Sequence, residues 1–278
     1  MSAHSHHSSI YQFPAAIKRL ESIDCDRGQR LRVFVPNGEF DVLSWMPAQI
    51  LDGPRWRVPT GWLTLGELEE QEAGRAFALL GFEYDSCISL EAIVSPETCP
   101  VAGVAEQALG LIAQIGSPAI KRFVEQALML EGAFPYFWTC PASLRDHHST
   151  VGGLAQHSLE VATMVASAAN LTAEVRDIGV AMALLHDLGK VWAYEDGIET
   201  REAHALGHER MAYNRLGPLF AELQKEDETL GLTMQALLGG EWRAGARKKR
   251  FAIGSVVYAF DQMSCENWRQ KDRRFGAS

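Results

Sequence analysis

The chain has 278 residues, of which 47% are hydrophobic and 22% are charged, a balance typical of a globular protein with one large or two smaller domains. It contains no run of about 18 apolar residues, which a transmembrane helix needs, so we expect no membrane insertion and a cytoplasmic location. The five cysteines are scattered without a CxxC pair, which favours a reducing compartment and argues against a disulfide-stapled fold. The net charge of −9 argues, at first, against a nucleic-acid partner.

The first nine residues are mostly Ser and His and lack the basic region and apolar run of a signal peptide. We expect residues 1–9 to be a disordered polar leader and assign no metal ligand to its histidines.

Residues 10–98 are predicted to form a small β-rich domain. Polar and apolar residues alternate over Arg30–Val35 and Glu39–Ser44, and Pro36-Asn37-Gly38 lies between these segments, which predicts a β-hairpin. Two more short strands and four aromatic core residues are expected in this region, namely Trp56–Val58 and Gly61–Leu65, and Trp45, Trp56, Trp62 and Phe82.

Residues 99–278 are predicted to be helical, because apolar residues recur at helical spacing from Val101 onward. A helix from Leu154 to about Ala169 places His157 on its inward-facing stripe. The following helix, Ala173–His186, is almost entirely apolar after its first turn, so we expect it to be central and enclosed.

The segment Leu184-Leu185-His186-Asp187-Leu188-Gly189-Lys190 sets an imidazole beside a carboxylate where this central helix ends. Other histidines and an aspartate lie at His157, His208 and Asp261. Imidazole and carboxylate ligands without a nearby cysteine suit Mn, Mg, Fe, Ni or Zn in a hydrolytic role better than a structural zinc site. The sequence therefore predicts a centre for one or two divalent ions.

The order His, His-Asp, His, Asp over residues 140–270 resembles the HD superfamily of metal-dependent phosphohydrolases. The resemblance implies a helical bundle in which His157, His186, Asp187 and Asp261 are the core metal ligands. It also implies that Asp187 bridges the ions if two are bound, that His208 is a further ligand, and that Lys190 faces the phosphate.

Two groups within the superfamily are similar over this longer stretch: the HD domain of MobH-type conjugative relaxases, and bacterial exoribonucleases that carry an OB-fold before the HD domain. The second group implies an OB-like arrangement for residues 10–98. The exoribonuclease pattern has Ser-His-His where this chain reads Leu238-Gly239-Gly240, which removes ligands for a second ion. The departure favours the relaxase-type domain, whose later pattern is similar to Asp261, Gln262 and Ser264.

The last 38 residues are basic, with nine Lys or Arg against four Asp or Glu. A cluster that includes Arg247 precedes the segment of Asp261 and could flank the metal site beside Trp242. A solvated loop between helices is the alternative interpretation of this cluster.

We therefore predict a metal-dependent phosphohydrolase, a phosphodiesterase or nuclease that acts on DNA or RNA. Asp187 and Lys190 are the candidate catalytic residues, and the candidate substrate-binding residues are His147, His148, Arg145, Lys190 and Arg247. The alternatives are a nucleotide phosphohydrolase and a non-catalytic module that binds nucleotide or nucleic acid without turnover.

Overall fold

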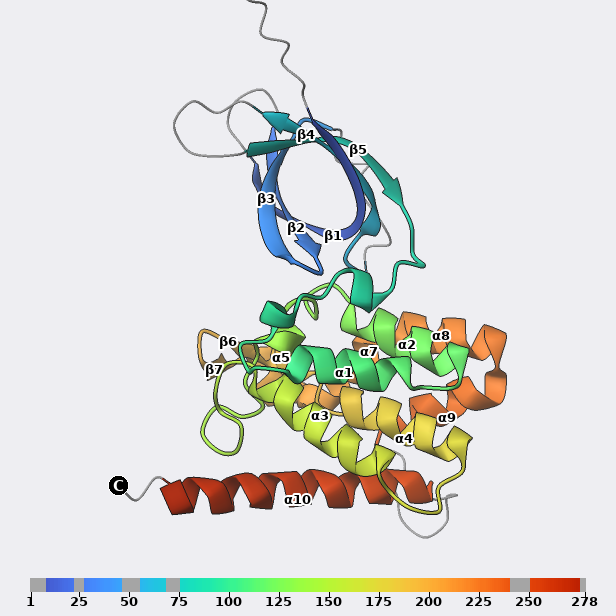
Figure 1. Cartoon of the computed structure of the whole chain (residues 1–278). Coiled ribbons are helices and arrows are strands. Elements are labelled where there is room, and N and C mark those ends of the chain that lie inside the picture. The colour runs from blue at the N-terminus through green and yellow to red at the C-terminus, as the bar shows by residue number, and fades with distance from the viewer. Residues whose placement is uncertain (1–8, 23–27, 47–55, 69–75, 241–250, 276–278) are drawn as a thin grey trace, which may run out of the picture. The chain divides into compact units, whose positions relative to one another are not determined.

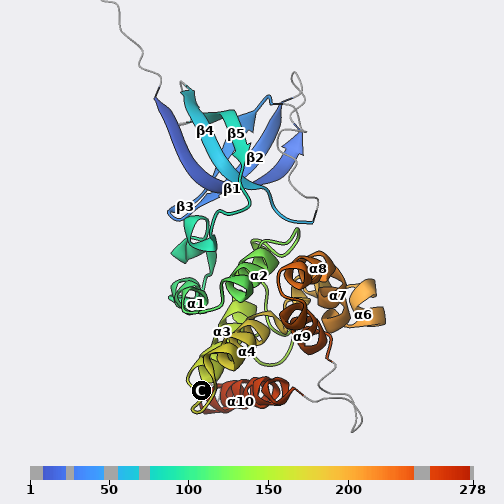
Figure 2. The same cartoon turned by 90° about the vertical axis from the view of Figure 1, so that its right-hand side faces the viewer.

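A computed structural model describes residues 9–22, 28–46, 56–68, 76–240 and 251–275. The chain divides into two compact units, residues 1–96 and residues 97–278. Figures 1 and 2 show the long strands gathered in the first unit and almost all of the helices in the second. Of the predicted segments, residues 1–8 of the leader and the basic cluster with Arg247 lie outside the described residues.

The first unit is a closed five-stranded barrel (Figure 1) with the strand order β1-β2-β3-β5-β4. Its strands are β1 (Ile10–Ser22), β2 (Gln29–Val35), β3 (Gly38–Ser44), β4 (Thr60–Leu68) and β5 (Ala76–Tyr84). The first half of β1 pairs with β4 and its second half with β2, while β3 and β5 run parallel. This is the strand arrangement of the OB-fold, as the resemblance implied.

The predicted hairpin is confirmed, because β2 and β3 pair in antiparallel register from Gln29↔Ser44 to Val35↔Gly38. Gly38 has φ 125°, a conformation that favours glycine. Side chains that alternate along the strands fill the barrel with Ile17, Leu31, Val33, Leu63 and Leu65 among others.

The prediction that four aromatic residues lie in the core of this unit is partly wrong. Trp45 and Trp62 are 51% and 42% exposed, whereas Phe82 packs against the barrel core. Trp62 falls on the outward-facing side of β4, between the buried Gly61 and Leu63. Trp56–Val58 is no extended strand and holds a single bridge residue.

The second unit is a helical bundle. Its helices are α1 (Val104–Ala113), α2 (Pro118–Leu128), α3 (Gly153–Ala166), α4 (Ala173–Leu185), α5 (Lys190–Ala193), α6 (Arg201–Leu206), α7 (His208–Arg215), α8 (Gly217–Glu226), α9 (Glu228–Leu238) and α10 (Ala252–Phe275), with the short hairpin β6 (Tyr194–Glu195) and β7 (Ile198–Glu199) after α5. Among the helices that the structure describes, none has both the length and the apolar character needed to cross a membrane.

Helix α4 is central, as its sequence predicts, and every residue from Asp177 to Leu185 is buried. Both α3 and α10 pack against it, and Figure 1 shows α10 running across the two. The buried Asp177 accepts a hydrogen bond from the backbone nitrogen of Ser117 at 2.8 Å, and the Ser117 side chain caps α2 by accepting from the nitrogen of Ile120. These contacts fix the frame that carries the candidate site.

Candidate metal centre

Three helices bring four of the predicted ligands together. His157 projects from α3, His186 and Asp187 follow the last residue of α4, and Asp261 lies on α10. His157 Nε2 lies 3.0 Å from Asp261 Oδ1 and 3.7 Å from Asp187 Oδ2. His186 Nε2 lies 3.4 Å from Asp187 Oδ2 and 3.8 Å from Asp261 Oδ1.

The distances between these atoms fit a shared cation. With metal–ligand bonds of about 2.1 Å, adjacent ligand atoms lie about 3.0 Å apart around an octahedral ion and about 3.4 Å apart around a tetrahedral one. His157 Nε2 and His186 Nε2 are both buried, and neither has a hydrogen-bond partner within the described part of the chain. Two orphaned imidazole nitrogens that face two carboxylates form a donor set that a divalent ion satisfies.

The other nitrogen of each imidazole is held by a hydrogen bond. His186 Nδ1 donates to the carbonyl of Ala183 at 2.8 Å. Ser264 Oγ donates to Glu160 Oε2 at 2.7 Å, so it accepts from His157 Nδ1 at 3.1 Å. In the neutral imidazole these contacts place the single proton on Nδ1 and leave Nε2, which faces the carboxylates, as the atom that can bind a metal.

The carboxylates and imidazoles of this cluster perturb one another strongly. Burial alone would lower the pKa of His186, but the charges of Asp187 and Asp261 raise it to about 10. Burial lowers the pKa of His157. Burial opposes ionisation of Asp187 and Asp261, yet the pKa of each carboxyl is lowered by the imidazoles around it. Both carboxyl groups are therefore ionised, and each favours a cation beside it.

Asp187 is held by two further side chains. Lys190 Nζ donates to its Oδ2 at 2.6 Å, and His208 Nε2 lies 3.1 Å from its Oδ1. Lys190 is only 8% exposed, and the charge of Asp187 raises its pKa although burial would lower it. The ammonium thus lies on the carboxylate of Asp187 rather than open to solvent, which favours a positioning role for Lys190.

The glycine of the Leu-Gly-Lys segment explains how His208 reaches this carboxylate. A Cβ built on Gly189 would lie 1.8 Å from the carbonyl oxygen of His208. The start of α5 and the start of α7 are therefore closer than any other residue at position 189 would permit.

The Gly-Gly-Leu segment plays the same role at the start of α3. A Cβ on Gly153 would lie 2.0 Å from the carbonyl oxygen of His148. His148 is fully buried, with its ring 4.3 Å from that of Trp268 and its Nε2 3.2 Å from Glu160 Oε2. No surface of His148 is left for a substrate, so this residue holds the loop rather than contacting substrate.

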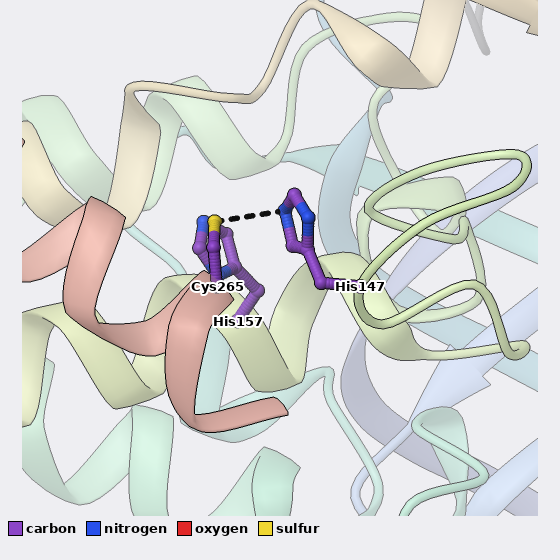
Figure 3. A group of neighbouring side chains, drawn as sticks. All are labelled: His147, His157 and Cys265. Carbon is purple, nitrogen blue, oxygen red and sulfur yellow. Dashed lines mark hydrogen bonds between the residues drawn. The ribbon is translucent and has the colours of Figure 1, made fainter. Parts of the chain in front are cut away.

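The other predicted substrate-binding residues are placed differently from His148. His147 points toward Cys265 of α10 (Figure 3), and its Nε2 lies 3.2 Å from the sulfur of that residue. The side chain of Arg145 is exposed, and Arg247 lies outside the described residues. The expectation of a ligand set without a nearby cysteine is wrong, because Cys265 lies 3.8 Å from Asp261 Oδ1.

A cavity of about 610 Å³ opens beside His208. It is lined by Glu209, Arg210, Tyr213 and Gln235, and by Gly239. A much smaller pocket next to it is lined by His186, Asp261, Glu209 and Gly240. The cluster therefore borders a cavity between α7 and α9, on the side where the sequence has Gly239-Gly240.

These residues can be compared with known proteins once their geometry is clear. Residues 154–247 match the family model of the HD domain. The chain contains an HD domain. Asp261 lies beyond the matched residues of the HD domain, and the structure joins it to the cluster through His157.

Curated relatives of the HD domain carry the name 3'-5' exoribonuclease YhaM. The protein from Listeria welshimeri is 31% identical over 114 residues, and those from Listeria monocytogenes and Listeria innocua are 32% identical over 114 residues. Each alignment covers 38% of this chain and 36% of the relative, so the chain spans little more than a third of these proteins. No solved structure matches the chain. The relaxase resemblance stays a prediction from the motif.

Proposed function

We propose that the protein is a metal-dependent phosphohydrolase that cleaves phosphodiester bonds in single-stranded RNA. The observation that carries this proposal is the pair of buried, orphaned Nε2 atoms of His157 and His186 facing Asp187 and Asp261. The similarity to exoribonucleases over the HD domain supports RNA as the substrate.

In this proposal His157, His186, Asp187 and Asp261 hold the cation. When bound, a divalent ion would lower the pKa of a water molecule and neutralise charge on a phosphoryl oxygen. Lys190 fixes the orientation of Asp187 through its 2.6 Å hydrogen bond. Ser264 keeps the proton of His157 on Nδ1, away from the reacting side.

The cavity beside His208 supplies the substrate side of the site in this proposal. Arg210 is a cation at its wall, and Tyr213 offers an aromatic ring and a hydroxyl that lies 2.9 Å from Gln235 Nε2. A guanidinium matches a phosphate group, and an aromatic ring stacks on a base.

The barrel supports a nucleic-acid strand as the substrate. A groove of about 530 Å³ in this unit is lined by Tyr11, Phe13, Phe40 and Phe77. The rings of Tyr11 and Phe77 lie 5.9 Å apart at 82°. Barrels of this topology bind oligonucleotides, and aromatic side chains in a groove stack on unpaired bases.

A nucleotide is the second candidate substrate. The cavity volume of about 610 Å³ falls in the range of sites for small molecules. A free nucleotide would fit there without any contribution from the barrel.

The test is hydrolysis of a 5'-labelled single-stranded RNA, a DNA of the same sequence and a panel of nucleotides, each with Mn²⁺, Mg²⁺ or Zn²⁺. We expect shortening of the RNA, and a loss of about a hundredfold or more in His186→Ala and Asp187→Asn, because the ion contributes several kcal/mol to the transition state. His204→Ala is the matched control, since His204 is an exposed histidine on α6. Hydrolysis of nucleotides alone contradicts the RNA substrate, and a metal-loaded but inactive chain supports a binding module instead.

A further inference from the structure

A second group of potential ligands adjoins the HD centre. One atom each from His147, His157 and Cys265 lies within 4.8 Å of the other two, and His157 also belongs to the group with His186 and Asp187. Figure 3 shows the imidazole of His147 directed at the sulfur of Cys265, with His157 beside that sulfur. The Sγ atom of Cys265 is 3.2 Å from His147 Nε2 and 3.8 Å from Asp261 Oδ1.

His157 belongs to both groups. Because its Nδ1 donates to Ser264, the nitrogen left for a cation is Nε2. That nitrogen is buried in a side chain with no exposed surface and has no hydrogen-bond partner among the residues described. An ion bound to His157 Nε2 would adjoin Asp187 and Asp261, and Asp261 Oδ1 in turn lies 3.8 Å from the sulfur of Cys265.

Contacts with α10 hold the loop that carries His147 beside Cys265. Arg269 on α10 donates to both carboxylate oxygens of Asp146, one of them at 3.0 Å from Nε. The ring of the neighbouring His148 packs against that of Trp268, with 4.3 Å between their centroids. His147 Nδ1 lies 3.6 Å from Asp146 Oδ2, a charge contact that is too long for a hydrogen bond, and the Nε2 atom of the same ring faces the sulfur.

We propose that Cys265 and His147 extend the ligand set of the HD centre, so that its cation takes a thiolate sulfur. The inference rests on the proposed metal centre. On binding, the sulfur–metal bond forms as the thiol proton leaves to solvent. A set of imidazole, carboxylate and thiolate selects Zn²⁺, Fe²⁺ or Co²⁺ over Mg²⁺ and Mn²⁺, which prefer oxygen ligands.

The test uses the full chain, purified free of metal in the presence of a reductant and loaded with one equivalent of Co²⁺. A thiolate bound to Co²⁺ gives a charge-transfer band in the near ultraviolet. We expect this band in the wild type and its loss in Cys265→Ser. Cys140→Ser is the matched control, because the Cys140 sulfur is 3.7 Å from the carbonyl oxygen of Lys190 but belongs to neither ligand group.

Affinity for Zn²⁺ gives a second readout. Competition with a chelator should show a dissociation constant raised at least about tenfold in Cys265→Ser and in His147→Asn. If a variant does not fold, X-ray absorption of the zinc-loaded wild type tests the same bond, since a sulfur ligand lies at about 2.3 Å and nitrogen or oxygen at about 2.0–2.2 Å.

The two proposals fail separately. A wild type that binds Co²⁺ without the charge-transfer band, or whose zinc shell holds only nitrogen and oxygen, overturns the thiolate ligand. The metal centre itself survives that result if His186→Ala removes the bound ion. Failure of the wild type to bind any of these ions overturns both.

Discussion

Gly189→Ala tests whether the close approach of α5 and α7 shapes the HD centre. The backbone at this position has φ −60° and ψ −18°, which alanine adopts readily, so the substitution adds only one methyl group. That methyl would lie 1.8 Å from the carbonyl oxygen of His208 and 3.2 Å from Cβ of Ala212. Real Cβ contacts do not fall below 3.0 Å, so α7 must retreat.

The expected cost follows from two opposing terms. Alanine restricts the unfolded chain more than glycine does, which stabilises the folded state by about 0.4–1 kcal/mol, whereas overpacking that moves backbone costs about 1–3 kcal/mol or more. The retreat of α7 also pulls His208 from Asp187, across the present 3.1 Å contact. We therefore expect net destabilisation and weaker metal binding together.

Urea unfolding and thermal melting measure the change in stability, and chelator competition measures the affinity for metal. Gly110→Ala is the matched control, because Gly110 lies inside α1 and no described atom lies within 4 Å of a Cβ built there. Alanine should stabilise the protein at that site by about 0.5–1 kcal/mol. A Gly189→Ala protein as stable as Gly110→Ala, with unchanged metal affinity, would refute the close approach.

Three further outcomes are expected. Ser264→Ala should weaken metal binding about 10–100-fold in chelator competition, because it removes the hydrogen bond that fixes the tautomer of His157. Ser149→Ala, at an exposed serine, should leave metal binding unchanged. Removal of the ion with a chelator should lower the free energy of unfolding by about 2.7 kcal/mol if the concentration of free ion was 100 times the dissociation constant. The chelator should not change the stability of His186→Ala. Arg269 lowers the pKa of Asp146 to about 2, so the stabilisation from this contact should be complete above pH 4 and lost as pH falls through 2, and carboxyl NMR titration should show the pKa returning toward 3.8 in Arg269→Gln.

The sequence predicts α3 and α4 well because their apolar periodicity is strong. The predicted helix at Ala173–His186 ends one residue beyond the observed α4. The barrel was harder to predict, since closure depends on the long strand β1 pairing with two different partners. The alternation of polar and apolar residues shows which face of a strand is buried, but it does not show which other strands that strand pairs with.

In the candidate site, too, residues that are close in the sequence were predictable and contacts between distant residues were not. His186 and Asp187 are adjacent in the sequence, so their spacing alone suggested a ligand pair. The position of Cys265 depends on α10 crossing α3, a contact between residues more than a hundred positions apart. One local signal was nevertheless present, because Cys265 follows Asp261 by four residues and therefore shares its face of the helix.

The two glycine motifs show how a short pattern can encode geometry over long distances. Gly153 admits the carbonyl of His148 to the start of α3, and Gly189 admits the carbonyl of His208 to the start of α5. Gly153 lies four residues before His157 and Gly189 lies two residues after Asp187, and the backbone admitted beside each glycine belongs to a histidine. The glycines therefore act on the centre by setting distances between backbones, and side-chain chemistry alone would not have assembled it.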